Sequence, residues 1–130
     1  MQAQCVRIPL FAGKTQRFVD WIGEMNSRRD EMLESMRLEG LVAEAMFLSR
    51  GMGGDAVILY MQAHDLQRAQ QVFAASTLAV DLDTRKIIDE CWDVTRAEPL
   101  DVLLELVGPV APASDSGRTL PPPATPDWGK

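Results

Sequence analysis

Residues 41–63, LVAEAMFLSRGMGGDAVILYMQA, decide the fold of this chain. Two apolar runs, at 41–50 and 56–63, flank the glycine-rich segment GMGGD at 51–55. Apolar runs of strand length that flank a glycine-rich connection predict an antiparallel β-hairpin. The chain therefore contains a sheet, and the elements on either side of the hairpin have to pack around it.

A strand and a long helix precede the hairpin. Residues 4–10, QCVRIPL, alternate in the manner of a strand, with every second residue apolar. Apolar residues then recur at helical spacing over residues 15–39, and Gly40 is a natural helix stop. Because Arg29 interrupts the apolar stripe, we expect the helix to kink or restart near residues 26–27.

Two helices and one strand follow the hairpin. Asp65 is a typical N-cap and predicts a helix that ends in a break near residues 76–81. A further helix is predicted at 83–95, and LDVLLELV at 100–107 reads as the last strand. Without the extra helix before the last strand, the order is βαββαβ, the ferredoxin-like motif. We therefore predict an α+β fold in which helices cover one face of a four-stranded antiparallel sheet.

The composition changes at the end of this predicted domain, which spans residues 1–107. Residues 108–130 contain six of the eight prolines and show no helical or alternating apolar pattern. Such a segment buries too little surface to offset its chain entropy. We therefore expect residues 108–130 to form a disordered or loosely docked tail.

Charge and residue counts exclude several function classes. The 130 residues include 13 Lys and Arg against 19 Asp and Glu, which gives a net charge of −6. This balance disfavours binding to nucleic acid or to an anionic membrane. One histidine and two separated cysteines cannot build a zinc site, so we expect no metal and no cofactor. Free thiols and the absence of a secretory signal pattern predict a cytoplasmic protein.

The face of the sheet away from the helices is predicted to be a partner surface. The helix-side residues expected on the second and last strands are Leu41, Ala43, Ala45, Phe47, Leu100, Val102, Leu104 and Leu106. The opposite face then carries Arg7, Glu44, Met46, Leu48, Ile58, Tyr60, Leu103 and Glu105. A face that mixes apolar and charged residues in this way is typical of an interface. We expect a homodimer whose two sheets stack through it and close a dimeric α/β-barrel, although a slip of one residue in a strand would reverse its faces.

Arg7 and Tyr60 are candidate ligand-binding residues on this face. A guanidinium and a phenol inside a dimer cavity could orient a small anionic organic ligand. The alternative is that Arg7 only neutralises Glu44 or Glu105 on adjacent strands, because opposite charges across a sheet are common.

His64 and the two tryptophans of the predicted domain are the other candidates. His64 is the only side chain whose usual titration lies near neutrality, and it could act as a general base at the sheet rim. Tyr60 is a second, weak catalytic candidate. Trp21 and Trp92 could line a ligand cleft, or they could be ordinary packing residues.

Several short segments carry a family resemblance: RIPL at 7–10, GK at 13–14, NSRRDE at 26–31, AQQVFAAS at 69–76 and ECW at 90–92. Together they resemble a family of small bacterial proteins of unknown function. The resemblance implies a ferredoxin-like fold of the dimeric α/β-barrel type, and it supplies no catalytic residues.

Two functional hypotheses follow from these observations. The first is a homodimeric small-ligand-binding or structural module without an identifiable catalytic set. The alternative is a cofactor-independent oxygenase or isomerase that acts on a small organic substrate. In that enzyme His64 or Tyr60 would be the acid or base and Arg7 would orient the substrate. The fold alone does not choose between them.

Overall fold

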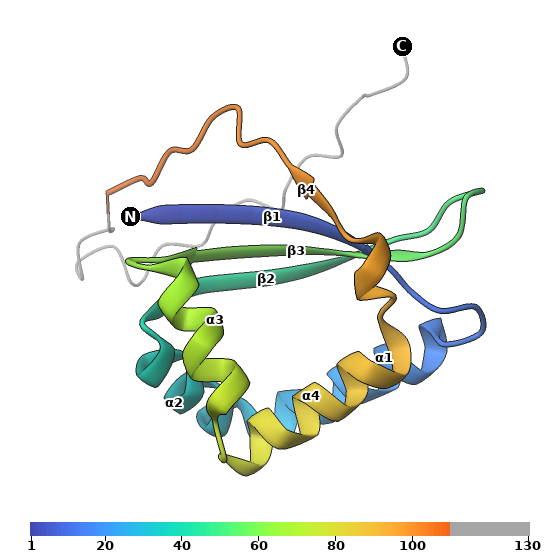
Figure 1. The fold of residues 1–130 in the computed structure, drawn as a ribbon, viewed down its shortest axis with the longest axis horizontal. Coiled ribbons are helices and arrows are strands. Elements are labelled where there is room, and N and C mark those ends of the chain that lie inside the picture. The colour runs from blue at the N-terminus through green and yellow to red at the C-terminus, as the bar shows by residue number, and fades with distance from the viewer. Residues whose placement is uncertain (110–130) are drawn as a thin grey trace, which may run out of the picture.

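A computed structural model describes residues 1–109, which form one sheet with helices on one side (Figure 1). The sheet is four-stranded and antiparallel, with strand order β2-β3-β1-β4. The strands are β1 (Gln2–Pro9), β2 (Leu41–Ser49), β3 (Ala56–Ala63) and β4 (Glu98–Leu100). The predicted tail lies, from residue 110 onward, outside the described residues.

The helices all lie against the same face of the sheet (Figure 1). They are α1 (Thr15–Met25), η1 (Asn26–Arg28), α2 (Arg29–Glu39), α3 (Leu66–Ala75), α4 (Ala79–Cys91) and η2 (Val94–Arg96). The α+β architecture with helices on one face is therefore confirmed.

The long helix predicted before the hairpin is interrupted where its apolar stripe fails. A single 3-10 turn at Asn26–Arg28 separates α1 from α2. Gly40 then ends α2 with a φ of 72°, and its N–H donates to the Arg37 carbonyl at 3.3 Å. Because this left-handed conformation strains residues with a Cβ atom, glycine suits the position.

The helix predicted at 83–95 instead runs from Ala79 to Cys91. Its start lies earlier because Ser76 and Asp81 order the first turn: the Ser76 hydroxyl donates to Asp81 Oδ2 at 2.5 Å and accepts from the Leu78 N–H at 3.2 Å. Its end lies earlier because Trp92 has extended backbone and forms a β-bridge with Leu10.

A β-bulge near the start of β2 reverses the faces predicted for most of that strand. Leu41 pairs with Ala63 but Ala43 pairs with Gln62, so one residue of β2 has no partner in the ladder. The side chains beyond the bulge therefore swap faces. Met46 packs on the core and Phe47 is 60% exposed on the other side, which contradicts our prediction for both.

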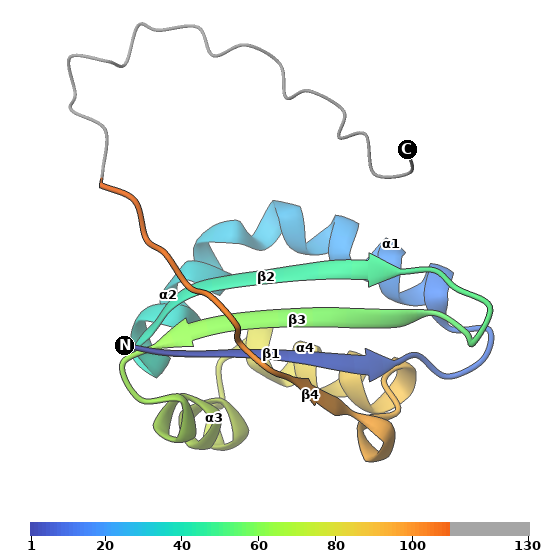
Figure 2. The ribbon, with the colours of Figure 1, turned by 90° about the horizontal axis from the view of Figure 1, so that it is seen from above.

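The last strand is much shorter than predicted. β4 comprises only Glu98–Leu100, paired with Cys5–Arg7 of β1, and residues 101–109 have no regular secondary structure. Leu100 is paired with Cys5 and therefore faces away from the helices, contrary to our prediction. Beyond it the chain arches over the sheet on the side away from the helices (Figures 1 and 2).

The main core lies between the sheet and the helices α1 and α4. Its fully buried members include Val57 of β3, which is 1% exposed, and Ile87 of α4, which is 2% exposed. The complete set of buried residues in this core is Ile8, Leu10, Phe18, Trp21, Met25, Val57, Leu59, Val80, Ile87, Cys91 and Trp92. A smaller cluster of Leu41, Ala63 and Ala69 joins α3 to the other end of the sheet.

Candidate functional site

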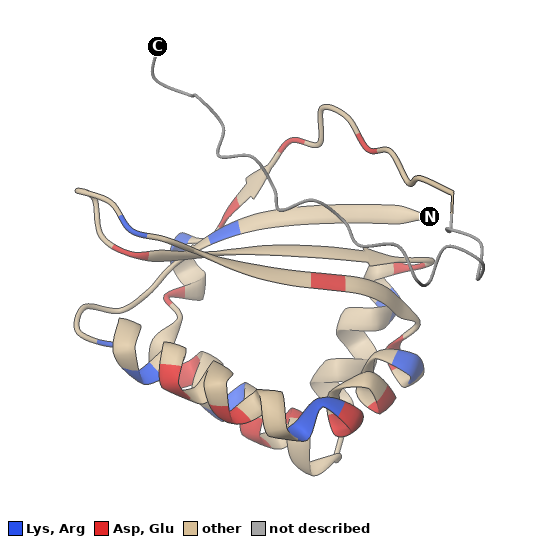
Figure 3. Ribbon diagram, turned by 180° about the vertical axis from the view of Figure 1, so that it is seen from behind, with Lys and Arg blue, Asp and Glu red and all other residues tan. Residues whose placement is uncertain are grey.

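The sheet face that points away from the helices is only partly covered. We call it the open face. Strand alternation and the observed register place these side chains on it: Ala3, Cys5, Arg7, Pro9, Ala43, Ala45, Phe47, Ser49, Ala56, Ile58, Tyr60, Gln62, Glu98 and Leu100. Charged residues gather on the helices, and the strands carry few (Figure 3). The open face is therefore mostly apolar, as a partner surface would be.

Arg7 and Tyr60 are brought together on the open face. Arg7 pairs with Ile58 and Cys5 pairs with Tyr60, so Arg7 and Tyr60 are diagonal neighbours on adjacent strands. Diagonal neighbours lie about 7–8 Å apart at their Cα atoms, which long side chains can span. A small anion could therefore contact both the guanidinium and the phenol.

The expected neutralisation of Arg7 by Glu44 or Glu105 is not seen. The bulge in β2 puts Glu44 on the helix side of the sheet, and Glu105 accepts a hydrogen bond from Gln62 Nε2 at 2.8 Å. Glu98 is opposite Arg7 in the ladder between β1 and β4. Among residues 1–109, however, the Arg7 guanidinium makes no side-chain hydrogen bond or ion pair, so it remains available to a ligand or partner.

His64 lies away from these two residues. It is exposed, directly follows β3 and precedes Asp65, whose carboxylate caps α3 by accepting from the Arg68 N–H at 3.1 Å. His64 lies four positions after Tyr60, which corresponds to about 13 Å along an extended strand. The structure therefore groups Arg7 with Tyr60 and leaves His64 at the rim.

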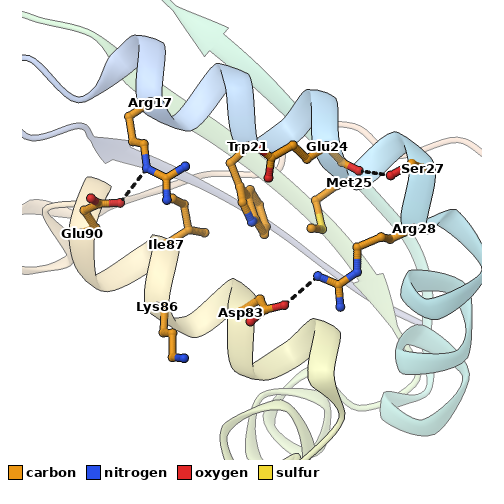
Figure 4. A pocket seen from close by; sticks show the side chains of 10 residues that line it. All are labelled: Arg17, Trp21, Glu24, Met25, Ser27, Arg28, Asp83, Lys86, Ile87 and Glu90. Carbon is orange, nitrogen blue, oxygen red and sulfur yellow. Dashed lines mark hydrogen bonds and ion pairs between the residues drawn. The ribbon is translucent and has the colours of Figure 1, made fainter.

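Trp21 lines a hollow of about 680 Å³ between α1 and α4 (Figure 4). Ion pairs join the two helices at this hollow, with Arg17 Nε 3.1 Å from Glu90 Oε2 and Arg28 Nη1 2.7 Å from Asp83 Oδ2. The full lining is Arg17, Trp21, Glu24, Met25, Ser27, Arg28, Asp83, Lys86, Ile87 and Glu90. Both arginines of the hollow are already paired with carboxylates, and Lys86 is the one lining cation that forms no ion pair among residues 1–109.

Trp92 is a core residue and does not line that hollow. It is 5% exposed and packs edge-on against Phe18, with the ring centroids 5.6 Å apart. Its buried Nε1 has no acceptor among the described residues. Trp92 is therefore a packing residue, and of the two tryptophans only Trp21 lines the hollow.

A chain of hydrogen-bonded carboxyl and hydroxyl groups, which the sequence analysis missed, joins three helices. Ser35 of α2 and Asp81 of α4 are both buried, and the Ser35 hydroxyl lies 2.6 Å from Asp81 Oδ1. The same hydroxyl lies 2.9 Å from Glu39 Oε1, and Ser76, just after α3, donates to Asp81 Oδ2 at 2.5 Å. No periodicity or motif could have found this group, because its members meet only in the tertiary structure.

The Ser35 hydroxyl has one proton and two carboxyl neighbours. It can donate to Asp81 or to Glu39 but not to both, so the second short contact requires a proton on one carboxyl. Burial, with the charges of Asp81 and Glu44 nearby, raises the pKa of Glu39 to about 7. Desolvation raises the pKa of Glu44 as well. We therefore assign the proton to Glu39, which then donates to Ser35.

Neither a metal-binding cluster nor a membrane-spanning helix occurs among the described residues. Within residues 1–109, no three or more His, Cys, Asp or Glu side chains are grouped to hold a metal ion. In the same part of the chain, no helix combines the length and the apolar character needed to cross a membrane.

Comparison with known proteins identifies one family. A family model described as a family of unknown function, DUF6176, matches residues 1–113. No curated protein and no solved structure matches the chain.

Proposed function

Because the chain belongs to DUF6176, a family of unknown function, we propose from its geometry that it is a homodimeric small-ligand-binding or structural module. The observation that carries the proposal is the open face, which is mostly apolar and which, within residues 1–109, is crossed only by the irregular segment after β4. Antiparallel sheets tolerate water on one face when that face is polar. Here the face is better suited to a second protein surface.

The proposal includes a ferredoxin-like fold and a dimeric barrel. The strand order β2-β3-β1-β4, with every neighbouring pair antiparallel, supports the ferredoxin-like arrangement. In the proposed dimer the open faces of two copies stack, because a two-fold axis lets the same patch serve both partners. The free thiols of Cys5 and Cys91 support a cytoplasmic location.

The ligand of this module would be a small organic anion. Arg7 supplies a cation and Tyr60 a hydroxyl to a surface that is otherwise mostly apolar. A guanidinium recognises a carboxylate through two parallel hydrogen bonds, more strongly once water is excluded. The enzymatic alternative needs an acid or base beside the ligand. Tyr60 is positioned for that role, whereas His64 is at the rim.

The dimer is tested by placing a charge on the open face. Phe47→Glu alters a side chain that is 60% exposed, so the single chain should still fold. In a symmetric dimer the change removes two buried phenylalanines, at about 1.5–3 kcal/mol each. We therefore expect dimer affinity to fall by about 10² to 10⁴-fold in sedimentation equilibrium.

The matched control is Leu33→Glu, which adds the same charge to a 51% exposed residue of α2 on the helix side. It should leave dimerisation unchanged. A wild-type chain that sediments as a monomer at high micromolar concentration would disprove the dimer.

The ligand is tested separately, by thermal shift with small carboxylic acids. A stabilisation of wild type that Arg7→Gln abolishes is expected, and equal shifts in both proteins would remove Arg7 from the site.

A further inference from the structure

Residues 101–107, which we call the arm, carry the most exposed run of apolar side chains in the described chain. Leu103 is 95% exposed, Leu104 76%, Leu106 82% and Val107 78%. Single exposed apolar residues are normal on protein surfaces, but a contiguous run in one segment marks an interaction site. The arm therefore has a binding surface and no occupant among residues 1–109.

The backbone of the arm is equally unpartnered. The ladder between β4 and β1 ends at Leu100 and Cys5, and none of the sheet or turn hydrogen bonds described for residues 1–109 involves the arm backbone. The sequence continues in a strand-like pattern, yet the chain leaves the sheet. On the β4 side, the edge of β1 at residues 2–4 is left without a paired strand. Unpaired edges and extended segments are the usual elements of strand exchange.

The arm lies on the same side of the sheet as the open face (Figures 1 and 2). One side-chain hydrogen bond ties it there, from Gln62 Nε2 to Glu105 Oε1 at 2.8 Å. The leucines nevertheless remain exposed, so the open face of the same chain does not bury them. An apolar arm and an apolar face thus lie on one side of the molecule without covering each other.

The area involved is sufficient for a stable dimer. An exposed Leu or Val side chain offers roughly 60–120 Å² of apolar surface. The four most exposed arm residues therefore offer roughly 240–480 Å² in one copy and twice that in two. A similar area of the opposing faces would be covered, which brings the total near the roughly 1,200–2,000 Å² of specific interfaces.

Charge also matches between the two surfaces. The arm carries the carboxylates of Asp101 and Glu105, and the open face carries one carboxylate, Glu98, and the Arg7 guanidinium, which has no ion pair among the described residues. An acidic arm that packs over this face would place carboxylates near an available cation.

We infer that the arm is exchanged between two copies of this chain, so that the leucines of each arm pack on the open face of the other copy. The inference rests on the proposed homodimer and specifies how the dimer is held together. It makes residues 101–107 part of the interface rather than a connection to the tail.

The first test is the double substitution Leu103→Asp, Leu104→Asp in the full chain, followed by sedimentation equilibrium. Both side chains are exposed in the single chain, so its fold should persist, and far-UV circular dichroism checks this. We expect the dimer dissociation constant to rise at least about 10³-fold, because four leucines leave the interface. The pair Leu106→Asp, Val107→Asp should act in the same direction and serves if the first variant misfolds.

The control pair is Leu33→Asp, Leu38→Asp, which charges two residues of α2 that are 51% and 45% exposed. It should leave the dissociation constant within about threefold of wild type. A dimeric wild type with unchanged affinity in both arm variants would overturn the exchange and leave the dimer standing. A monomeric wild type would instead overturn the proposed dimer itself.

Cross-linking distinguishes exchange from an arm that folds onto its own sheet. Leu103→Cys adds a thiol to the arm, and the native Cys5 thiol lies on the open face. A short bis-maleimide should then give a covalent dimer on a denaturing gel, and adding Cys5→Ser should remove it. Cross-linked monomer alone would show that each arm stays on its own chain. A covalent dimer that survives Cys5→Ser would show that the arms meet each other, and either result overturns the inference.

Discussion

Glu39→Gln tests whether the proton held by Glu39 makes this fold more stable in mild acid than in base. In the wild type, Ser35 lies within hydrogen-bond distance of both Asp81 and Glu39, so both contacts are hydrogen bonds only while one of the two carboxyls is protonated. Glutamine keeps the shape of protonated glutamate, and its amide can donate to the Ser35 hydroxyl at any pH. The variant therefore fixes the protonated arrangement.

The sign of the effect follows from the raised pKa. The pKa of Glu39 is about 7 in the folded chain against 4.5 ordinarily, so the native state binds this proton more tightly than the unfolded chain. The resulting stabilisation is fully present below about pH 4.5 and is lost as the pH rises through about 7. At about 1.36 kcal/mol for each unit of pKa, the upper limit is about 3.4 kcal/mol. Because Glu39 is partly exposed, we expect about 1–2 kcal/mol.

The assay is urea denaturation of wild type and Glu39→Gln at pH 5, 6, 7 and 8. At pH 5 the variant should be more stable by less than about 1 kcal/mol, because Glu39 is then protonated in the folded chain and ionises only on unfolding. At pH 8 the variant should be more stable by about 1–2 kcal/mol. Some decline with pH should remain in the variant, since the pKa of Glu44 is also raised.

The control is Glu34→Gln on the same helix. Glu34 is exposed and its pKa is lowered by the hydrogen bond from Arg37. Removing such an exposed surface pair should change the free energy of unfolding little at any of these pH values, with no gain at pH 8. If wild type and Glu39→Gln differed by the same free energy of unfolding at pH 5 and pH 8, the assignment of a proton to Glu39 would be refuted.

Two further predictions concern glycine and cysteine. Gly23→Ala should stabilise the chain by about 0.5–1 kcal/mol, because Gly23 lies inside α1 with open space at its Cβ position. Gly40→Ala should destabilise the chain by about 1 kcal/mol, because a φ of 72° strains a residue with a Cβ atom even though the space around it is open. If both glycine substitutions shifted the thermal unfolding midpoint in the same direction, this reasoning would be contradicted. In thiol labelling of the native chain, Cys5 should react before Cys91, which is fully buried and whose pKa is raised mainly by burial. A fast phase that persists in Cys5→Ser would contradict this order.

Most of the fold could be predicted because local signals agree with the tertiary structure. The glycine-rich turn at 51–55 does join two strands, and Gly40 does end a helix. The break near residue 26 was visible as a charge in an apolar stripe. Where the prediction failed, the cause was not local: the bulge in β2 depends on pairing with β3, and no sequence pattern signals it.

The candidate site was predicted in part. Alternation on two well-marked strands correctly put Arg7 and Tyr60 on one face. The same rule wrongly continued the last strand to residue 107. That segment has a strand-like apolar pattern, but it does not continue the ladder along the free edge of β1, and its leucines stay exposed. The apolar pattern of the arm is explained if the arm packs on another copy of the chain.

By itself, the sequence determined the element order and the helix and strand types. These follow from periodicity and glycine positions, which are properties of the chain alone. Only the tertiary structure decided which face Phe47 occupies, that the arm leaves the sheet, and that Ser35 lies within hydrogen-bond distance of both Glu39 and Asp81. Those outcomes depend on register and on contacts between distant segments, where a shift of one residue reverses a face or separates a hydrogen-bonded group.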